Sequence, residues 1–175
     1  DMEAGYGTDL DTIVDLVLSI AGLGAVGINI EDSYKTSTGL KSSADQVELL
    51  AAIRKALDEK GYSDFYINAR VDTYLQKQEL AETIKRASAY VEGGASGIFV
   101  PGVHEATDIQ ELGQKIDAPL NVMSLPNLMS IKELNALGVK RLSMGNAFSD
   151  AVIGFKEKTA RTVIEANSTL LLYQE

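Results

Sequence analysis

The feature that most constrains the fold of this chain is a short apolar run that stops abruptly at charged residues. Residues 27–32 read GINIED, so an isoleucine-based run ends at Glu31 and a second carboxylate. A buried parallel strand has this pattern where its C-terminal end opens into a polar site. The pattern recurs where later apolar runs reach Arg70, Asn121 and Ser143. Such repetition is typical of a βα barrel, in which the chemistry lies at the C-terminal ends of the strands.

Helical patterns separate the predicted strands. We expect strands at residues 25–30, 65–69, 97–100, 120–123 and 141–144. Each is followed by apolar residues at helical spacing, and this alternation requires right-handed crossovers and a parallel sheet. Residues 1–3 have the character of the end of one more strand. These strands are too few to close an eight-stranded barrel.

Capping residues predict where the helices begin. Ser43 and Ser130 are each followed three residues later by Gln or Glu, which is the pattern of a capping box. Thr8 is the expected N-cap of the first helix. The last helical pattern covers residues 147–172, and we expect a break in it near Gly154.

The composition excludes several classes of function. The chain has no cysteine, which excludes disulfides, thiolate metal sites and cysteine nucleophiles. A net charge of −9 without a basic cluster argues against a nucleic-acid partner. No apolar run reaches the roughly 18 residues of a membrane span, and the start does not resemble a secretory signal. We therefore expect a cytoplasmic protein with no membrane partner.

Three carboxylates, Asp1, Glu3 and Glu31, stand at neighbouring predicted strand ends. Such oxygen donors suit Mg²⁺, which binds few protein carboxylates directly and keeps water or substrate in its other positions. Glu31 is the most informative, because Ile30 should be buried directly before it. The alternative is that Glu31 compensates the charge of Arg70, and the residues alone leave both roles open.

Arg70 ends a predicted buried strand, so its charge requires an anion. That anion is either a protein carboxylate, Asp72 or Glu31, or a substrate carboxylate held through two hydrogen bonds. Tyr6 lies between two glycines in the first turn of the chain and either lines the mouth of the same site or packs beside it.

Other polar residues are candidates for binding substrate. Asn121 offers both a donor and an acceptor, and Ser143 and Gly145 stand where barrels present backbone N–H groups to an anionic group. Lys35 lies in the polar loop 33–43, which is either a lid over the barrel mouth or an idle surface loop. Lys35 correspondingly reaches a bound acid or remains an exposed surface lysine.

Six motifs occur in the order in which one known superfamily carries them. They are residues 1–7 (DMEAGYG), 27–32 (GINIED), 67–72 (INARVD), 97–102 (GIFVPG), 119–122 (PLNV) and 137–145 (LGVKRLSMG). Together they cover nearly the whole chain and resemble the signatures of the isocitrate lyase/phosphoenolpyruvate mutase superfamily.

The resemblance implies an α/β fold of the (β/α)8 TIM barrel type, present here as an incomplete barrel from the end of the third strand onward. Residues 1–175 would form a single barrel domain. The resemblance also implies Mg²⁺ as cofactor and a reaction at a C–C or P–C bond through an enolate-like species. The expected substrate is a small anionic 2-oxo or hydroxy carboxylic acid, such as phosphoenolpyruvate, oxaloacetate or phosphonopyruvate.

Individual roles follow from the same resemblance. Asp1, Glu3 and Glu31 match acidic residues around the Mg²⁺, and Arg70 matches an arginine that binds substrate or stabilises its developing charge. Asn121 matches a substrate-binding position of some branches. Glu31 and Arg70 are therefore the expected catalytic residues.

Two departures narrow the expected activity. The lyase branch carries a Lys-Arg-Cys-Gly-His lid, whereas residues 35–39 read KTSTG, which argues against isocitrate or methylisocitrate cleavage. Pro101 stands where the mutase branch has a histidine, which argues against a strict mutase. The remaining branch is poorly characterised, and hydrolysis or decarboxylation of an oxaloacetate-like acid is the activity we expect.

The resemblance also implies strands and a metal-shell aspartate before Asp1, and a last helix that packs on a neighbouring subunit, so we expect a homo-oligomer, a dimer or a tetramer. Two alternatives to an enzyme remain at this point. One is a truncated, inactive barrel remnant that acts as a binding or interaction module. The other is an open five-stranded α/β binding module.

Overall fold

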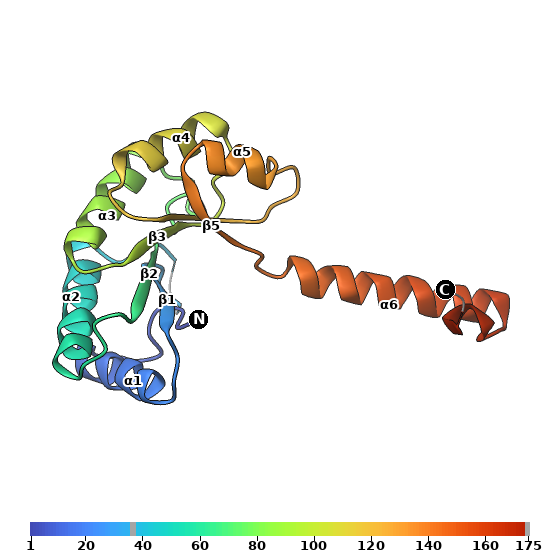
Figure 1. Cartoon of the computed structure of the whole chain (residues 1–175), viewed down its shortest axis with the longest axis horizontal. Helices are drawn as coiled ribbons and strands as arrows, with labels where there is room; N and C mark the ends of the chain where they lie inside the picture. Colours follow the sequence, from blue (N-terminus) through green and yellow to red (C-terminus); the bar gives the residue numbers. More distant parts are fainter. Residues whose placement is uncertain (36–37, 174–175) are drawn as a thin grey trace. The chain divides into compact units, whose positions relative to one another are not determined.

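The computed structural model describes residues 1–35 and 38–173, and it divides into two units, residues 1–143 and 144–175. The first unit contains one parallel sheet, drawn in Figure 1. Its strands are β1 (Gly27–Glu31), β2 (Tyr66–Arg70), β3 (Gly97–Val100), β4 (Leu120–Met123) and β5 (Val139–Ser143). The predicted α/β class and parallel sheet are confirmed.

The strands lie side by side in the order in which the chain makes them, from β1 to β5. An order without reversal places every right-handed crossover helix on the same face, which is the arrangement of a βα barrel and not of a doubly wound sheet. The crossover helices are α2 (Ser43–Glu59), α3 (Leu80–Glu92), α4 (Ala106–Lys115) and α5 (Ile131–Ala136), and α1 (Leu10–Gly22) precedes β1. Within the described residues β1 and β5 are the two edges, so closure into eight strands stays a prediction.

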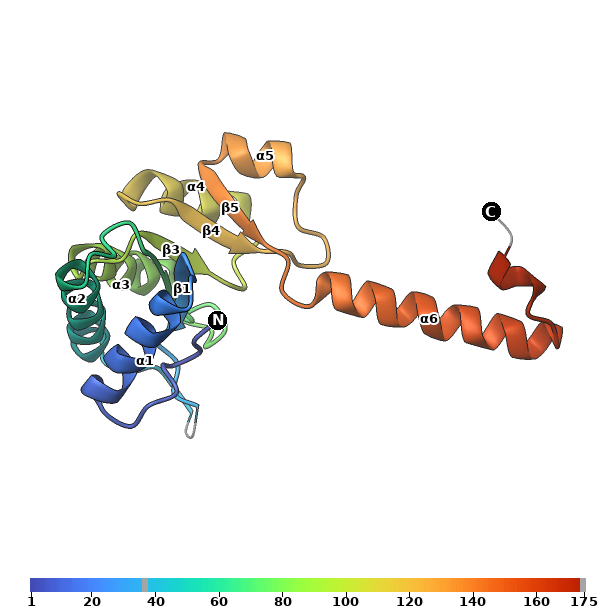
Figure 2. The same ribbon diagram turned by 60° about the horizontal axis from the view of Figure 1, so that its bottom comes forward.

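The helices cover the outer side of the sheet (Figure 1). Helix α1 contacts α2, α2 contacts α3, and α3 contacts α4, and Figure 2 shows α1 and α2 side by side. Side chains alternate between the two faces of a strand, and Ile30, Ile67 and Ile98 are fully buried in the resulting core. The apolar side chains of each strand therefore pack against the helices, and the alternate, mostly polar side chains project from the opposite face of the sheet.

One row of the sheet carries the polar residues that the sequence singles out. Glu31 pairs with Arg70, Arg70 with Phe99, and Phe99 with Asn121. Residues in register on neighbouring parallel strands project from the same face. The pairing therefore places Glu31, Arg70 and Asn121 in a single line across β1, β2 and β4.

The helix starts differ from their predicted positions by one residue in two cases. The N-cap of α1 is Asp9 and not Thr8, because Asp9 has the extended backbone of a cap and its carboxylate accepts from Thr12 N at 2.9 Å. The N-cap of α2 is Ser42 and not Ser43. The capping box at Ser130 is confirmed.

The second unit consists of α6 (Ala147–Ala166) and a short 3₁₀ helix, Leu170–Tyr173. The predicted break near Gly154 is wrong, since α6 continues through this residue. The helix ends instead at Asn167, whose backbone has a φ of 46°. Asparagine tolerates this left-handed conformation and commonly ends helices. No residue of α6 is buried.

No helix in the described part of the chain combines the length and the apolar character needed to cross a bilayer.

Replacing Ile30 with Ala should lower the free energy of unfolding by about 2–5 kcal/mol, because it removes fully buried apolar surface and leaves a cavity. Urea unfolding followed by circular dichroism measures the loss. Val26, 83% exposed just before β1, supplies the control, and Val26→Ala should change stability by no more than about 0.5 kcal/mol. Equal losses in the two variants would contradict the placement of Ile30 in the core.

Candidate active site

The first residues of the chain lie beside β1. Met2 N donates to Asn29 O at 2.9 Å, and Glu31 N donates to Glu3 O at 2.8 Å. The chain then turns sharply at Gly5, which has a φ of 116° and whose missing Cβ would lie 2.8 Å from the Cδ1 atom of Ile13. Only glycine fits this position without strain. The turn holds Glu3 over the end of β1.

Lys35 joins two of the predicted metal-site carboxylates. Its Nζ atom lies 2.7 Å from Oε1 of Glu31 and 3.2 Å from Oε2 of Glu3. The hydrogen bond to Glu31 raises the pKa of Lys35, and the hydrogen bond from Lys35 lowers the pKa of Glu3. Lys35 is therefore a cation between two carboxylates, with its side chain 46% exposed. The sequence did not predict this role.

Arg70 contacts both of the carboxylates that the sequence proposed for it. Its Nε and Nη2 atoms donate to Asp72 at 2.6 and 3.1 Å, and its Nη1 atom lies 2.9 Å from Oε2 of Glu31. Glu31 and Asp72 are almost fully buried, whereas the Arg70 side chain is 22% exposed. The guanidinium group has five N–H groups. The described contacts account for three of them, and two remain for an anion.

The sequence did not identify the buried group behind this pair, which is the carboxylate of Asp32. It accepts from Asp72 N at 2.9 Å and from the Tyr90 hydroxyl at 2.7 Å, and Arg86 Nη1 lies 3.3 Å away. Burial raises the pKa of the Asp32 carboxyl above its ordinary value. The sequence did contain a sign of this buried carboxylate. Arg86 and Tyr90 lie four residues apart, on the same buried face of α3, where an arginine needs an anionic partner.

Asn121 and Ser143 are brought together. Asn121 Nδ2 donates to Ser143 Oγ at 3.0 Å, and Asn121 is buried. Gly145 belongs to the second unit and has a φ of 52°, so its predicted place in the site stays a prediction. The Asp1 carboxylate accepts from Glu3 N at 2.9 Å, and its predicted place among the metal ligands stays a prediction.

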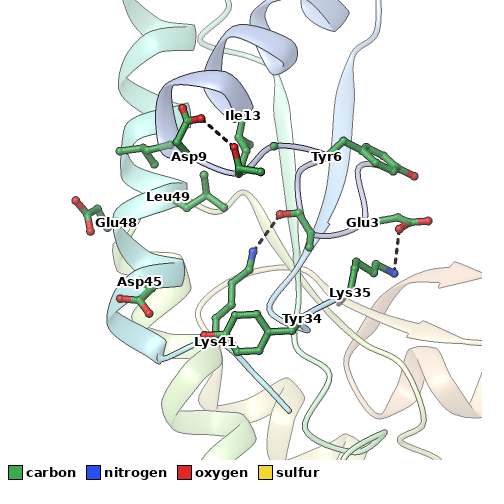
Figure 3. Close-up of a pocket in the computed structure, with 14 residues that line it drawn as sticks. Glu3, Tyr6, Asp9, Ile13, Tyr34, Lys35, Lys41, Asp45, Glu48 and Leu49 are labelled. Atoms are coloured by element: carbon green, nitrogen blue, oxygen red, sulfur yellow. Dashed lines mark hydrogen bonds and ion pairs between the residues drawn. The ribbon is translucent and has the colours of Figure 1, made fainter. Parts of the chain in front are cut away.

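A pocket of about 670 Å³ opens beside this cluster, as Figure 3 shows. Glu3, Tyr6 and Lys35 line it together with the start of α2. Lys41 reaches into its wall and donates from Nζ to Ala4 O at 3.0 Å, and burial lowers the pKa of this lysine. Tyr6 lines this pocket, but Arg70 and Asn121 do not, so the predicted place of Tyr6 at the mouth of the same site stays a prediction.

The predicted loop 33–43 is only partly described, because residues 36 and 37 lie outside the described residues. Its base is an antiparallel bridge between Ser33 and Leu40, and Tyr34 N donates to Gly39 O at 3.2 Å. The described residues 33–35 and 38–40, called the hairpin below, include Lys35, which contacts Glu31 and Glu3. Its role as a lid stays a prediction.

The fit of Mg²⁺ depends on Glu3 and Glu31. Within residues 1–35 and 38–173, no three Asp, Glu, His or Cys side chains gather closely enough to form a complete metal site. Mg²⁺ binds to proteins through only one or two carboxylates, and one cationic atom, Lys35 Nζ, already contacts both Glu3 and Glu31. The two carboxylates therefore fit a cation between them.

Comparison with known proteins identifies the family of the chain. Residues 1–164 match the family model of phosphoenolpyruvate phosphomutase. The chain belongs to this family. The wider phosphoenolpyruvate mutase/isocitrate lyase superfamily contains lyases and mutases of carboxylic acids, so the resemblance drawn from the six motifs is confirmed.

Relatives and solved structures show the same relationship. The chain is 36% identical to the uncharacterized protein Rv1998c of Mycobacterium tuberculosis, over 93% of this chain and 60% of that protein. It is 28% identical to an oxaloacetate decarboxylase of Pseudomonas entomophila, over 87% of this chain and 54% of the enzyme. The chain thus spans about 60% or less of the length of these curated relatives.

Two crystal structures share the fold. One, from Burkholderia cenocepacia J2315 and assigned provisionally to the lyases or mutases, has 32% identity and a TM-score of 0.89 over 96% of this chain and 62% of its own. The other is a phosphonopyruvate hydrolase in complex with oxalate and Mg²⁺, with 20% identity and a TM-score of 0.81 over 96% of this chain and 60% of its own.

Asp32 should make stability depend on pH. Because its pKa is raised in the fold, the stability that it contributes is fully present below its ordinary pKa of 3.8 and is lost as the pH rises through the folded-state value. The loss is about 1.4 kcal/mol for each unit by which the two pKa values differ. The Asp32→Asn variant does not titrate there, so urea unfolding should show the wild-type stability falling relative to the variant as the pH rises through this window. A difference that stays constant with pH would contradict this assignment.

Proposed function

We propose that the protein is a Mg²⁺-dependent enzyme that acts on a C–C or P–C bond of a small 2-oxo or hydroxy carboxylic acid through an enolate-like species. The observation that carries this proposal is Arg70, which retains two N–H groups beside the buried carboxylate of Glu31. An arginine fork of this kind matches the two oxygens of a carboxylate. The likeness to an oxaloacetate decarboxylase supports an oxaloacetate-like acid as the substrate.

In this proposal Arg70 binds the acid and stabilises the charge that grows during bond cleavage. For decarboxylation, the bond between C3 and the C4 carboxylate breaks, and CO₂ leaves. The electron pair moves to the C2 oxygen as an enolate, and C3 later takes a proton from water. Of the two free N–H groups of Arg70, one would donate to the carboxylate of the acid and the other to the developing oxyanion, while Glu31 contacts the guanidinium from β1.

Glu3 and Glu31 are the residues that would hold Mg²⁺, with Asp1 beside them. A bound Mg²⁺ would supply Lewis-acid polarisation of the carbonyl oxygen. The phosphonopyruvate hydrolase of the same fold is described with Mg²⁺ and oxalate. Oxalate resembles the enolate of a small 2-oxo acid in charge and shape, so it is a suitable probe of the proposed site.

The remaining predicted residues complete the proposal. Asn121 and Ser143 would bind the polar end of the acid as one hydrogen-bonded pair. Tyr6 and Lys35 would close the side on which the pocket opens. Lys35 would leave the carboxylates for the acid when a cation occupies its place.

The Arg70→Ala variant should lose about 100-fold or more in kcat/KM, because it removes the donors that stabilise the oxyanion. Arg70→Lys should restore only part of this loss, since an ammonium group cannot form the two-pronged contact. The assay follows decarboxylation and hydrolysis of oxaloacetate and related acids with Mg²⁺, using the full protein as the cell makes it.

Lys115→Ala supplies a matched control, because it removes an exposed cation whose partner is Glu111. It should leave turnover unchanged. An unchanged kcat/KM in Arg70→Ala would contradict the proposed role. Oxalate binding without turnover of any such acid would instead favour the alternative of an inactive barrel that acts as a binding module.

The second unit supports a homo-oligomer. Phe148, Val152 and Phe155 lie at positions i, i+4 and i+7 of α6, and all three are exposed. A long apolar stripe on an exposed helix marks an interaction site. We propose a second copy of this chain as the partner, in agreement with the superfamily resemblance.

Phe155→Glu should weaken this association, because it places a charge in an apolar contact. Sedimentation velocity should show the wild-type protein as a dimer or a tetramer and the variant shifted toward the monomer. Lys158→Glu changes a charged side chain one turn further along α6 and is the matched control. A wild-type protein that sediments as a monomer at all concentrations would contradict the proposal.

A further inference from the structure

One carboxylate connects the hairpin to the proposed substrate-binding arginine. Oδ1 of Asp72 accepts from Arg70 Nε at 2.6 Å, and Oδ2 accepts from Arg70 Nη2 at 3.1 Å. The same Oδ2 atom accepts a hydrogen bond from the hydroxyl of Ser33, a residue 39 positions earlier in the chain. Ser33 is thus in contact with the group that orients Arg70.

Ser33 also forms the base of the hairpin, through its bridge to Leu40. Lys41 N, directly after this bridge, donates to Asp32 O at 2.8 Å. The hairpin therefore contacts the two carboxylates around Arg70. The Ser33 hydroxyl donates to Asp72, and the Lys35 ammonium group forms an ion pair with Glu31. Both carboxylates in turn contact Arg70.

Asp72 is itself held in place. Its backbone N–H donates to the buried carboxylate of Asp32, and its own side chain is almost fully buried. An arginine side chain has many rotamers, and fixing its planar fork through two hydrogen bonds sets the direction of the remaining N–H groups. Asp72 accepts from Nε and from one N–H of Nη2 of Arg70. The two unused N–H groups are the second one on Nη2 and one on Nη1.

We propose that Asp72 is a positioning residue that couples the base of the hairpin to Arg70. The Ser33 hydroxyl stabilises the position of the Asp72 carboxylate in which Arg70 presents its free N–H groups to the acid. The identity of the bound acid rests on the proposed function. The coupling between Ser33, Asp72 and Arg70 does not, and it can be measured without any ligand.

The ligand-free measurement is hydrogen exchange at Arg70 Nε–H, followed by proton–nitrogen NMR of the arginine side chains. The Arg70→Lys variant assigns the signal by its loss. Ser33→Ala should speed exchange by about 3–10-fold, which corresponds to one lost hydrogen bond. Ser33→Thr keeps the hydroxyl and should restore wild-type exchange, and Asp72→Asn should speed exchange by more than Ser33→Ala does.

The second measurement is calorimetric binding of oxalate in the presence of Mg²⁺. Ser33→Ala should raise the Kd by about 3–10-fold, and Ser33→Thr should return it to the wild-type value. Ser63→Ala is the matched control, because Ser63 is exposed and lies in the turn before β2. It should change neither readout, and the melting temperatures of all the serine variants should stay close to that of the wild type.

Unchanged exchange at Arg70 in Ser33→Ala would overturn the proposal, whatever the oxalate result. If Asp72→Asn does not fold, the Ser33 variants still test the proposal. Ser33→Ala removes a single hydroxyl group and Ser33→Thr keeps it, so both should fold. If the wild-type protein does not bind oxalate while exchange still responds to Ser33→Ala, the coupling is supported and the proposed acid-binding function fails. Loss of oxalate binding that Ser33→Thr does not restore would also count against the coupling.

Discussion

The arrangement of the whole site depends on one buried carboxylate, Asp32. It has no exposed surface, and an ionised group in such a place is tolerated only when it is paired and hydrogen-bonded. Tyr90 and Arg86 of α3 provide this compensation from one side, and the backbone of Asp72 provides it from the other. The same interaction therefore ties the end of β1 to the end of β2 and to the helix that follows.

A series of contacts connects Asp32 to the residues of the proposed site. Asp32 holds the backbone of Asp72, Asp72 holds Arg70, Arg70 contacts Glu31, and Glu31 contacts Lys35. Each of the three buried carboxylates, Asp32, Asp72 and Glu31, contacts at least one cationic side chain before any ligand arrives. Removing one member leaves its partner buried and uncompensated, which is costly. This coupling explains why the residues around Arg70 matter as much as those that would touch an acid.

The strand order and register of the sheet bring the charged side chains together. A parallel strand order without reversal brings the C-terminal ends of β1, β2 and β4 to one edge, and the register places Glu31, Arg70 and Asn121 in one row. The helices cover the opposite face, so the polar row is available for a ligand. In βα barrels the chemistry lies at this end of the strands.

The sequence predicted the elements well where a local rule decides them. The strands at 97–100 and 120–123 and the capping box at Ser130 occur as expected. It failed by one residue at Asp9 and Ser42, where two adjacent residues can both cap a helix and backbone conformation decides between them. It also predicted a break near Gly154 that does not occur, because a single glycine costs less in a long helix than the pattern suggested.

By itself the sequence determined the alternation of apolar strand and polar end, and with it the face on which each side chain lies, because the period of a strand is two residues. It also offered Asp72 and Glu31 as partners of Arg70 without choosing between them. Only the tertiary structure decided that both contact Arg70, that Lys35 lies between Glu3 and Glu31, and that Asp32 stands behind them. The physical reason is distance along the chain. Asp32 meets Asp72 across 40 residues and Arg86 across 54, and no local pattern encodes which buried charges will meet once the strands pair.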